Sequence, residues 1–453
     1  MDRREFIKKM SATTAATSAI VYAKGRNKAT GGLDKLFSSE NEPTDNMTKR
    51  TFPGIQKPVS LLGYGGMRWP TIKDDNGHQI IDQEKVERLI DYAMKHGVNY
   101  YDTAPVYHGG ASEGAMGKAL SRYPRESYQI ATKLSNFNKS QWNVDAAKKM
   151  YEHSMKQLQV DYIDYYLLHS LGKGRDSFIQ RFAENGILDF LQEERKQGRI
   201  RHLGFSFHGD RESFLTALDY PVKWDFVQIQ LNYFDWVTDS DERPSAQYMY
   251  SELEKRGIPV VVMEPLLGGR LAKLDNSLME ELKKRDAEKS PASWAFRFVG
   301  SLPQIMTVLS GMTYISHLTE NIDVFSPLVP ITEDEQTFLQ ETAVSMMKHP
   351  VIPCTACRYC MPCPFGVDIP GNFAYFNKQL LAGQVPASRQ SANYAKARKR
   401  FLADIGKSVN AKAQSTHCTA CGHCLPQCPQ HIQIPDQMKR INKLIEEFKN
   451  KKS

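Results

Sequence analysis

The fold is decided by one repeated pattern, which residues 84–104 show as EKVERLIDYAMKHGVNYYDTA. The first half has the spacing of an amphipathic helix, because apolar side chains recur every three or four residues on one face. These side chains are Val86, Leu89, Ile90 and Ala93. Gly97 stands where a helix is expected to stop, and the aromatic run 99–102 is typical of a short strand. The stretch predicts a helix followed directly by a strand.

The same unit recurs along the middle of the chain. Strands are predicted at residues 59–62, 99–102, 128–132, 163–168, 200–206, 226–231, 258–263 and 306–309. Strands that alternate with helices indicate a parallel sheet with helical crossovers. Eight such units over about 250–300 residues favour a closed (β/α)8 TIM barrel over an open sheet. The turn Gly63-Tyr64-Gly65-Gly66 lacks the spacing of a Gly-x-Gly-x-x-Gly dinucleotide motif.

The composition is that of an ordinary globular protein. Of the 453 residues, 41% are hydrophobic and 24% are charged, and the formal net charge is +8. This excludes a mostly disordered or collagen-like chain, and no run approaches the roughly 18 uncharged apolar residues of a membrane span. The basic excess lies at the two ends, while the middle is mildly acidic. We therefore expect neither nucleic acid as a partner nor a transmembrane segment.

The amino terminus resembles a bacterial twin-arginine export signal. Arg3 and Arg4 precede Phe6 and Ile7, and a weakly hydrophobic, Ala- and Thr-rich stretch follows up to residue 23. The signal predicts a periplasmic or otherwise exported protein that crosses the membrane already folded. The alternative is a disordered basic tail on a cytoplasmic protein.

Four chemically active side chains are predicted to meet at one end of the barrel. Asp102, Lys133 and His169 follow the second, third and fourth strands, and Tyr107 lies on the loop after Asp102. A barrel gathers its chemistry at the carboxyl ends of its strands. A tyrosine with a pKa of about 10 is a poor acid, but a lysine ammonium oriented by Asp102 would stabilise its phenolate. His169 would then polarise a substrate carbonyl while Tyr107 delivers a proton.

At these residues the sequence resembles the aldo-keto reductase family. Three motifs match in order and spacing: Asp102-Thr103-Ala104-x-x-Tyr107, Ala131-Thr132-Lys133 and Leu167-Leu168-His169. The resemblance covers about residues 55–325 and implies a (β/α)8 barrel with a nicotinamide cofactor across its mouth and a small carbonyl or alcohol substrate. Each residue alone also has a structural interpretation: Asp102 as a helix cap, Lys133 as a solvated loop residue and His169 as a core histidine.

The same resemblance assigns six positions to the cofactor: Ser206, Gln228, Met263, Gly311, Glu320 and Asn321. Gln228 matches the residue that contacts the nicotinamide carboxamide, whereas Met263 stands where the family commonly stacks a tyrosine. Glu320 and Asn321 match the adenine side, but residues 310–317 contain no Arg or Lys to hold a 2′-phosphate. The resemblance implies NAD(P)H, without support for a preference for NADPH. NADH, or no nicotinamide at all, stays open.

The eight cysteines form two related runs near the carboxyl terminus: Cys354-x-x-Cys357-x-x-Cys360-x-x-Cys363-Pro and Cys418-x-x-Cys421-x-x-Cys424-x-x-x-Cys428-Pro. The second run has the spacing of bacterial ferredoxins, in which the fourth cysteine ligates the other cluster. We predict two 4Fe–4S clusters. Cluster one takes Cys354, Cys357, Cys360 and Cys428, and cluster two takes Cys418, Cys421, Cys424 and Cys363. The alternatives are zinc and disulfides. Zinc is disfavoured because its sites use cysteine pairs and not triplets followed by Cys-Pro, and disulfides are disfavoured because the eight cysteines form two ferredoxin-type runs.

These features divide the chain into five parts: a signal peptide at 1–23, a linker at 24–50, the barrel at 51–348, a small, mainly helical ferredoxin-like domain at 349–440, and a basic tail at 441–453. The whole resembles a bacterial branch of the aldo-keto reductases that carries such a domain and a twin-arginine signal. The basic run 396–400 is interpreted as a solvated face or as a docking site for a redox partner protein.

Two classes of function follow from this organisation. The first is an oxidoreductase that interconverts a carbonyl and an alcohol with a nicotinamide cofactor, and exchanges electrons with the two clusters. The second is a binding and electron-transfer module, in which a degenerate barrel docks a partner and only the clusters carry electrons. The intact set of Asp102, Tyr107, Lys133 and His169 favours the first class, and the replacement at Met263 favours the second.

Overall fold

The computed structural model describes residues 46–347, 351–386 and 389–450. The predicted signal peptide and most of the predicted linker lie outside these residues. No helix in the described part of the chain is both long enough and apolar enough to cross a membrane.

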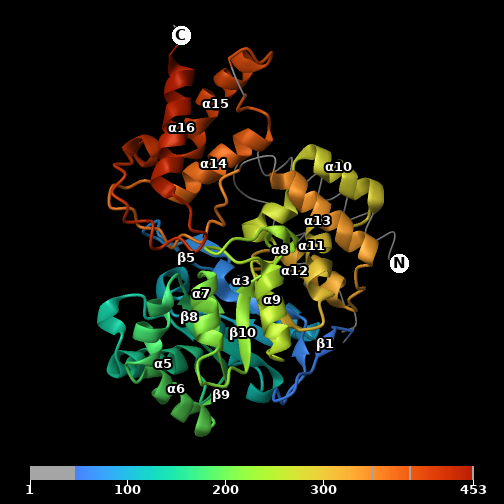
Figure 1. The fold of residues 1–453 in the computed structure, drawn as a ribbon, viewed down its shortest axis with the longest axis vertical. Helices are drawn as coiled ribbons and strands as arrows, with labels where there is room; N and C mark the ends of the chain where they lie inside the picture. The colour runs from blue at the N-terminus through green and yellow to red at the C-terminus, as the bar shows by residue number, and fades with distance from the viewer. Residues whose placement is uncertain (1–45, 348–350, 387–388, 451–453) are drawn as a thin grey trace. The chain divides into compact units, whose positions relative to one another are not determined.

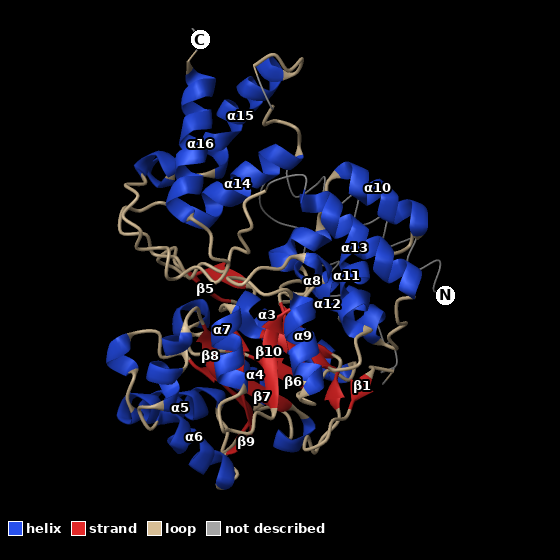
Figure 2. Ribbon diagram, in the orientation of Figure 1, coloured by secondary structure: helices blue, strands red, loops and turns tan. Residues whose placement is uncertain are grey.

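Eight parallel strands close into a barrel, as the sequence predicts (Figure 2). The strands are β3 (Leu62–Gly65), β6 (Tyr100–Asp102), β7 (Gln129–Leu134), β8 (Ile163–Leu171), β9 (Ile200–Phe207), β10 (Phe226–Gln230), β11 (Val260–Met263) and β12 (Ile305–Ser310). Each strand pairs with the next in the sequence, and β12 closes the ring on β3. The strands are almost entirely buried, which accounts for their continuous apolar and aromatic runs in the sequence.

Helices connect the strands and surround the barrel: α3 (Gln83–Lys95), α4 (Ser112–Leu120), α5 (Val144–Leu158), α6 (Ile187–Lys196), α7 (Arg211–Leu218), α9 (Ala246–Lys255), α11 (Pro291–Gly300) and α12 (Ile315–Phe325). Helix α3 shows how the sequence sets these elements. The Asp82 side chain accepts the Lys85 N–H and caps the helix. The predicted apolar face of α3 is the face that is buried. Additional elements are α8 (Tyr233–Val237), α10 (Asn276–Arg285), α13 (Glu333–Met347), and the hairpin of β4 (Thr71–Lys73) and β5 (Gln79–Ile81).

The first barrel strand begins later than the sequence predicts. Residues Val59–Ser60 form β2, which pairs antiparallel with β1 (Lys49–Arg50), and the barrel strand starts at Leu62. Ile55 and Val59 pack against the strand-start residues Tyr100 and Phe226, so the β1–β2 segment covers the amino-terminal end of the barrel. The two residues of β1 lie just before the predicted start of the barrel at residue 51, and they form a two-stranded sheet with β2 that is separate from the closed barrel.

The carboxyl-terminal part is built from helices and cysteine-bearing loops. The helices are α14 (Ile369–Leu381), α15 (Tyr394–Ser408) and α16 (Ile434–Lys449), which lie together at the red end of the chain in Figure 1. Their buried side chains, including Phe376, Phe401 and Phe448, form one apolar core that the cysteines flank. Helix α16 continues past residue 440, where the basic tail is predicted to begin, and Ile441, Ile445 and Phe448 occupy its buried face.

The two cysteine runs repeat in conformation as well as in sequence. Ala356 and Ala420, the third residues of the two Cys-Thr-Ala-Cys segments, have φ angles of 53° and 57°. The residue after the second cysteine of each run is also left-handed, with φ of 66° at Arg358 and 77° at Gly422. Each run is followed by a helix with proline in its first turn, α14 or α16. The sequence repeat therefore encodes a structural repeat.

Candidate functional site

Asp102 and Lys133 form a buried ion pair at the carboxyl ends of β6 and β7. Lys133 Nζ donates to both Asp102 carboxylate oxygens, at 2.7 and 2.8 Å, and to the Thr103 carbonyl oxygen at 2.7 Å. Asp102 is 3% exposed and Lys133 is 0% exposed. Burial raises the pKa of Asp102 and lowers the pKa of Lys133, and each charge partly offsets the shift of the other. The pair is a fixed part of the barrel end.

Tyr107 lies against this pair on the loop after β6. Lys133 Nζ is 5.1 Å from the centroid of the Tyr107 ring, while its hydrogen bonds go to Asp102 and Thr103. Burial, with smaller contributions from Tyr359 and Asp102, raises the pKa of Tyr107 well above its ordinary value. The predicted stabilisation of a phenolate by Lys133 is thus not the governing effect in this structure. Tyr107 is a neutral hydroxyl at physiological pH, which is the form that can donate a proton.

His169 faces Tyr107 from the end of β8. Its ring is 6.0 Å from the Tyr107 ring, edge to face. Nδ1 is hydrogen-bonded to the Ser135 hydroxyl at 2.5 Å, and the His169 carbonyl accepts a bond of 2.9 Å from the Arg181 guanidinium. Burial, reinforced by the charges of Lys133 and Arg181, lowers the pKa of His169 well below its ordinary value. The imidazole is therefore neutral and can polarise an oxygen without carrying charge.

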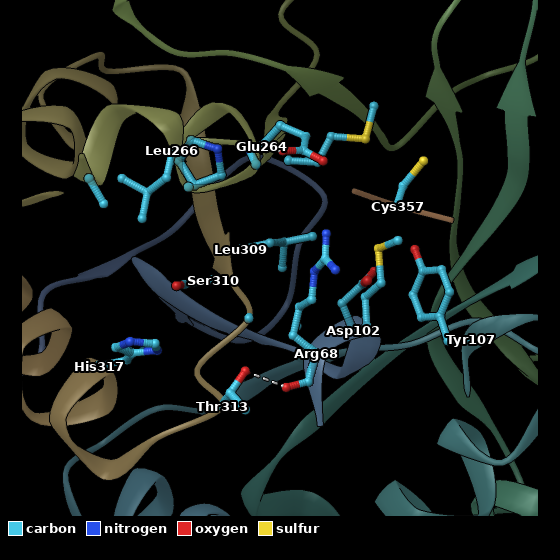
Figure 3. A pocket seen from close by; sticks show the side chains of 18 of the residues that line it. Arg68, Asp102, Tyr107, Glu264, Leu266, Leu309, Ser310, Thr313, His317 and Cys357 are labelled. Carbon is cyan, nitrogen blue, oxygen red and sulfur yellow. Dashed lines mark hydrogen bonds between the residues drawn. The ribbon is translucent and has the colours of Figure 1, made fainter. Parts of the chain in front are cut away.

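A cavity of about 550 Å³ joins these side chains to the predicted cofactor residues. Asp102, Tyr107 and His169 line it, as do all six predicted cofactor positions: Ser206, Gln228, Met263, Gly311, Glu320 and Asn321. Lys133 stands behind the wall, bonded to Asp102. In Figure 3, Asp102 and Tyr107 lie on one side of the cavity, and Ser310 and His317 lie on the other. The structure thus gathers the predicted residues into one site.

Gln228 and Met263, which are predicted to contact the nicotinamide, line the cavity together with Tyr107 and His169. Gln228 Nε2 donates to Met263 Sδ at 3.4 Å, while Gln228 Oε1 is buried and has no hydrogen-bond partner in the described structure. Ser206 Oγ accepts the backbone N–H of Ser170 at 2.7 Å. Ser170 has a φ of 55° and follows His169 at an irregularity of β8. Ser206 therefore helps to hold the backbone next to His169.

The opposite end of the cavity holds the predicted adenine-side pair. Asn321 Nδ2 donates to Ser310 Oγ at 2.9 Å, and the Glu320 carboxylate accepts a bond from the Ser290 hydroxyl. Among the described residues that line the cavity, Arg68 is the one Arg or Lys. A Cβ at Gly311 would lie 2.8 Å from Arg68 Cβ, so Gly311 leaves room for the arginine to cross the cavity (Figure 3).

The cysteine loops close the cavity over its catalytic end. Arg68 donates to the carbonyl oxygens of Thr355 and Ala356, at 2.8 and 3.0 Å. Gln430, two residues after Cys428, exchanges amide hydrogen bonds with Gln230 at the end of β10, at 2.8 and 3.4 Å. As a result Cys357, Tyr359, Pro429 and Gln430 line the same cavity as Tyr107. The sequence patterns did not reveal these contacts of Arg68 and Gln430 between the barrel and the cysteine loops.

Five of the cysteines line one hollow in the carboxyl-terminal part. They are Cys363, Cys418, Cys421 and Cys424, the set assigned to cluster two, and Cys360 of the other set. In the other group, burial and the nearby charges of Cys357, Cys354 and Cys428 raise the pKa of Cys360 to about 12. Burial likewise raises the pKa of Cys357 to about 11.

Thiolates held this close repel each other unless cations compensate them, which suits iron–sulfur cores. No three His, Cys, Asp or Glu side chains in the described residues are arranged to hold a metal ion. The fit of the cysteines to clusters therefore rests on their grouping and spacing. The hollow at Cys363 is lined by carboxyl-terminal residues alone, whereas Cys357 of the other group lines the barrel cavity.

Tyr359 is the functional candidate that the sequence patterns missed. It stands between Cys357 and Cys360, yet its hydroxyl lies 3.4 Å from His169 Nε2 and is hydrogen-bonded to Tyr107. The only signal in the sequence is an aromatic residue between two cluster cysteines. Contact with a histidine 190 residues earlier could not be predicted from that signal.

Both the barrel and the carboxyl-terminal part of the chain match known protein families. Residues 61–342 match the aldo/keto reductase family, and residues 353–434 match a 4Fe–4S dicluster domain. The chain therefore belongs to the aldo/keto reductase family, a family of oxidoreductase enzymes, and carries a carboxyl-terminal 4Fe–4S dicluster domain.

Individual relatives cover the barrel. The chain is 26% identical over 303 residues to L-galactose dehydrogenase from Arabidopsis thaliana, covering 63% of this chain and 90% of the relative. It is 24% identical to the NADH-specific methylglyoxal reductase of Escherichia coli, covering 56% of this chain and 86% of that protein. The solved structure of aldo-keto reductase AKR11C1 from Bacillus halodurans, in its holo form, has the same fold, with a TM-score of 0.53, 23% identity, and coverage of 65% and 96%.

Proposed function

We propose that this protein interconverts a small carbonyl compound and an alcohol with a nicotinamide cofactor, and that it exchanges the electrons with two 4Fe–4S clusters. The observation that carries the proposal is the shared cavity. Tyr107, His169 and Gln228 of the barrel line it together with Cys357 of the cluster-one set. Electron transfer between the carbonyl site and a cluster requires the two to lie close together, and here a cluster ligand lines the same cavity as the carbonyl site.

The protein's own residues supply the proton chemistry. Tyr107 is neutral and donates its proton to the substrate oxygen as hydride reaches the carbonyl carbon. His169 is also neutral and hydrogen-bonds the same oxygen, with its ring orientation held by Ser135. The Lys133 ammonium, which Asp102 holds in place, lies 5.1 Å from the centroid of the Tyr107 ring, where it opposes the Asp102 charge as negative charge develops during proton transfer.

The cavity fits a nicotinamide. A buried amide oxygen without a partner is costly, and the free Gln228 Oε1 suits the N–H groups of a carboxamide. When bound, the cofactor supplies or accepts hydride. Arg68, the one Arg or Lys on the described lining, is bonded to Thr355 and Ala356 and not free at the adenine end. NADH is therefore proposed over NADPH, because a 2′-phosphate would lack a cationic partner.

The two cysteine groups set an order for the relay. When bound, the clusters accept and donate single electrons. Cys357, of the cluster-one set, borders the barrel cavity, while Cys421, of the cluster-two set, is exposed. We therefore place cluster one next to the nicotinamide and cluster two next to an external redox partner. Export by the twin-arginine route, as a folded and loaded protein, is part of the same proposal.

The experiment follows the oxidation of NADH and NADPH by anaerobic, cluster-loaded protein with methylglyoxal and benzaldehyde as carbonyl probes. Consumption of NADH that depends on the carbonyl and is lost in Tyr107→Phe is the expected result. The proposal is contradicted if the loaded protein binds neither nucleotide and Tyr107→Phe changes no activity.

A further inference from the structure

The side chain of Tyr359 leaves the cluster-one loop and enters the catalytic end of the barrel. Its hydroxyl is hydrogen-bonded to Tyr107 and lies 3.4 Å from His169 Nε2. Its ring lies 6.4 Å from the His169 ring and 6.1 Å from the Phe137 ring. Tyr359 thus contacts both groups to which proton donation and carbonyl polarisation have been assigned.

Under the proposed function, a substrate oxygen must bind between these same two groups. It would accept the Tyr107 proton and lie at His169 Nε2, where the Tyr359 oxygen already lies. Two oxygens cannot occupy that position together. We propose that the Tyr359 hydroxyl occupies the substrate-oxygen position in the free protein, and that a bound carbonyl displaces it. This inference rests on the proposed function of Tyr107 and His169.

The surroundings of Tyr359 favour movement of its side chain over movement of the whole loop. The loop backbone is tied to the barrel by the Arg68 guanidinium, through Thr355 and Ala356. Behind it, a Cβ on Gly268 would lie 2.5 Å from Thr355 Cα, which shows how closely the loop packs on the segment after β11. A rotation of Tyr359 can open the oxygen position while Cys357 and Cys360 stay in place.

Because the Tyr359 hydroxyl competes with the ligand oxygen for one position, it lowers the affinity of the site for carbonyl and carboxylate oxygens. A ligand oxygen must replace the bonds that Tyr359 makes, so removing the hydroxyl should improve binding. A typical hydrogen bond contributes enough free energy to change an affinity about two- to tenfold. The phenyl ring of a Tyr359→Phe variant keeps the wall formed with Phe137.

The test measures acetate binding to cluster-loaded protein by saturation-transfer NMR of the acetate methyl group, at constant ionic strength. Acetate presents acceptor oxygens and is not turned over. Wild type is compared with Tyr359→Phe, with Tyr92→Phe as the control, because Tyr92 is a half-buried tyrosine on α3, outside the cavity lining. Tyr359→Phe is expected to bind acetate about two- to tenfold more tightly, and Tyr92→Phe to bind it like wild type.

Each other outcome overturns the inference in a distinguishable way. Equal binding by wild type and Tyr359→Phe, abolished in both backgrounds by His169→Ala, would leave the carbonyl site in place and remove the role of Tyr359. Weaker binding by Tyr359→Phe would make the hydroxyl a donor to the ligand instead of its competitor. Binding by neither protein would overturn the carbonyl site as well.

Discussion

The barrel site and the cluster domain are organised by different means. In the barrel, protein groups alone hold the buried ion pair: Lys133 is fully buried and makes three hydrogen bonds to Asp102 and Thr103. In the cluster domain, the cysteine loops flank a helical core, and burial raises the thiol pKa values of Cys357 and Cys360. The buried charges of the barrel site thus compensate each other within the protein, whereas burial disfavours the thiolate forms of Cys357 and Cys360. The contacts of Tyr359 join the two.

The largest expected effect separates the two clusters. Cys428→Ser removes a ligand from cluster one, and Cys363→Ser removes one from cluster two. In the proposed assignment each variant lacks one ligand of one cluster, so each should lose about half of the iron of a two-cluster protein. Only Cys428→Ser should also disturb the barrel cavity, since Pro429 and Gln430 line it. Iron analysis and nucleotide binding measure the two effects.

Loss of cluster two in Cys428→Ser and of cluster one in Cys363→Ser would contradict the cross-ligation. The identity of the remaining cluster can be read from the electron paramagnetic resonance spectrum of the reduced protein. Equal damage to nucleotide binding by Cys363→Ser and Cys428→Ser would show that the two clusters do not differ in their distance from the barrel cavity.

The next effect concerns chemistry in the barrel. Tyr107→Phe should lower carbonyl-dependent NADH oxidation about 10²- to 10⁴-fold, because a positioned acid contributes that much to a proton transfer. The iron content should stay unchanged, since Tyr107 is not a cluster ligand. Tyr92→Phe, a hydroxyl deletion on the outer helix α3, serves as the control and should retain full activity.

A third change tests whether the buried Asp102–Lys133 pair contributes to the stability of the barrel. Lys133→Met leaves the Asp102 carboxylate buried without its partner, which should cost about 3–5 kcal/mol of stability. The double variant Asp102→Leu/Lys133→Met should recover much of this loss, because neither charge remains buried. Thermal unfolding of cluster-loaded protein, followed by circular dichroism, compares the three proteins. A Lys133→Met variant as stable as wild type would show that the pair is not part of the barrel's stability.

The smallest expected effect is on the pH dependence. The pKa of His169 lies well below its ordinary 6.5, because burial and nearby cations disfavour the charged ring. The imidazole is therefore neutral on both sides of pH 6.5, and it gains a proton only in more acidic solution. Acetate is expected to bind at Tyr107 and His169, and its affinity should therefore show no titration step near pH 6.5. A step there that disappears in His169→Gln would contradict a neutral histidine.

Much of the fold was predictable because its determinants are local. Buried parallel strands read as short apolar runs, and the helices between them carry their periodicity in a few turns, as α3 shows. The residues at the strand ends then meet by topology, which is why Asp102, Lys133 and His169 were predicted together. The exceptions have physical causes. The apolar run 59–62 predicts one strand, but Val59 belongs to β2, which pairs antiparallel with β1 outside the barrel. A short apolar run does not reveal which partner strand it pairs with.

Other features depend on contacts that no local pattern contains. Residues 441–449 carry Lys443 and Lys449 together with Glu446 and Glu447, and these charged side chains lie on a helix whose inner face holds Ile441, Ile445 and Phe448. Arg68 crosses the cavity because Gly311 has no side chain. Tyr359 reaches His169 from 190 residues away. These contacts arise only when the cysteine loops pack on the barrel.

The visible spectrum of anaerobic, cluster-loaded protein mixed with NADH tests most directly whether the barrel and the clusters exchange electrons. Bleaching by NADH, to a large fraction of the bleaching that dithionite produces, is the predicted result. Gln228→Leu should slow it, since Gln228 Oε1 is the free acceptor in the cavity. Clusters that dithionite bleaches but neither NADH nor NADPH affects would contradict an electron relay between the two halves.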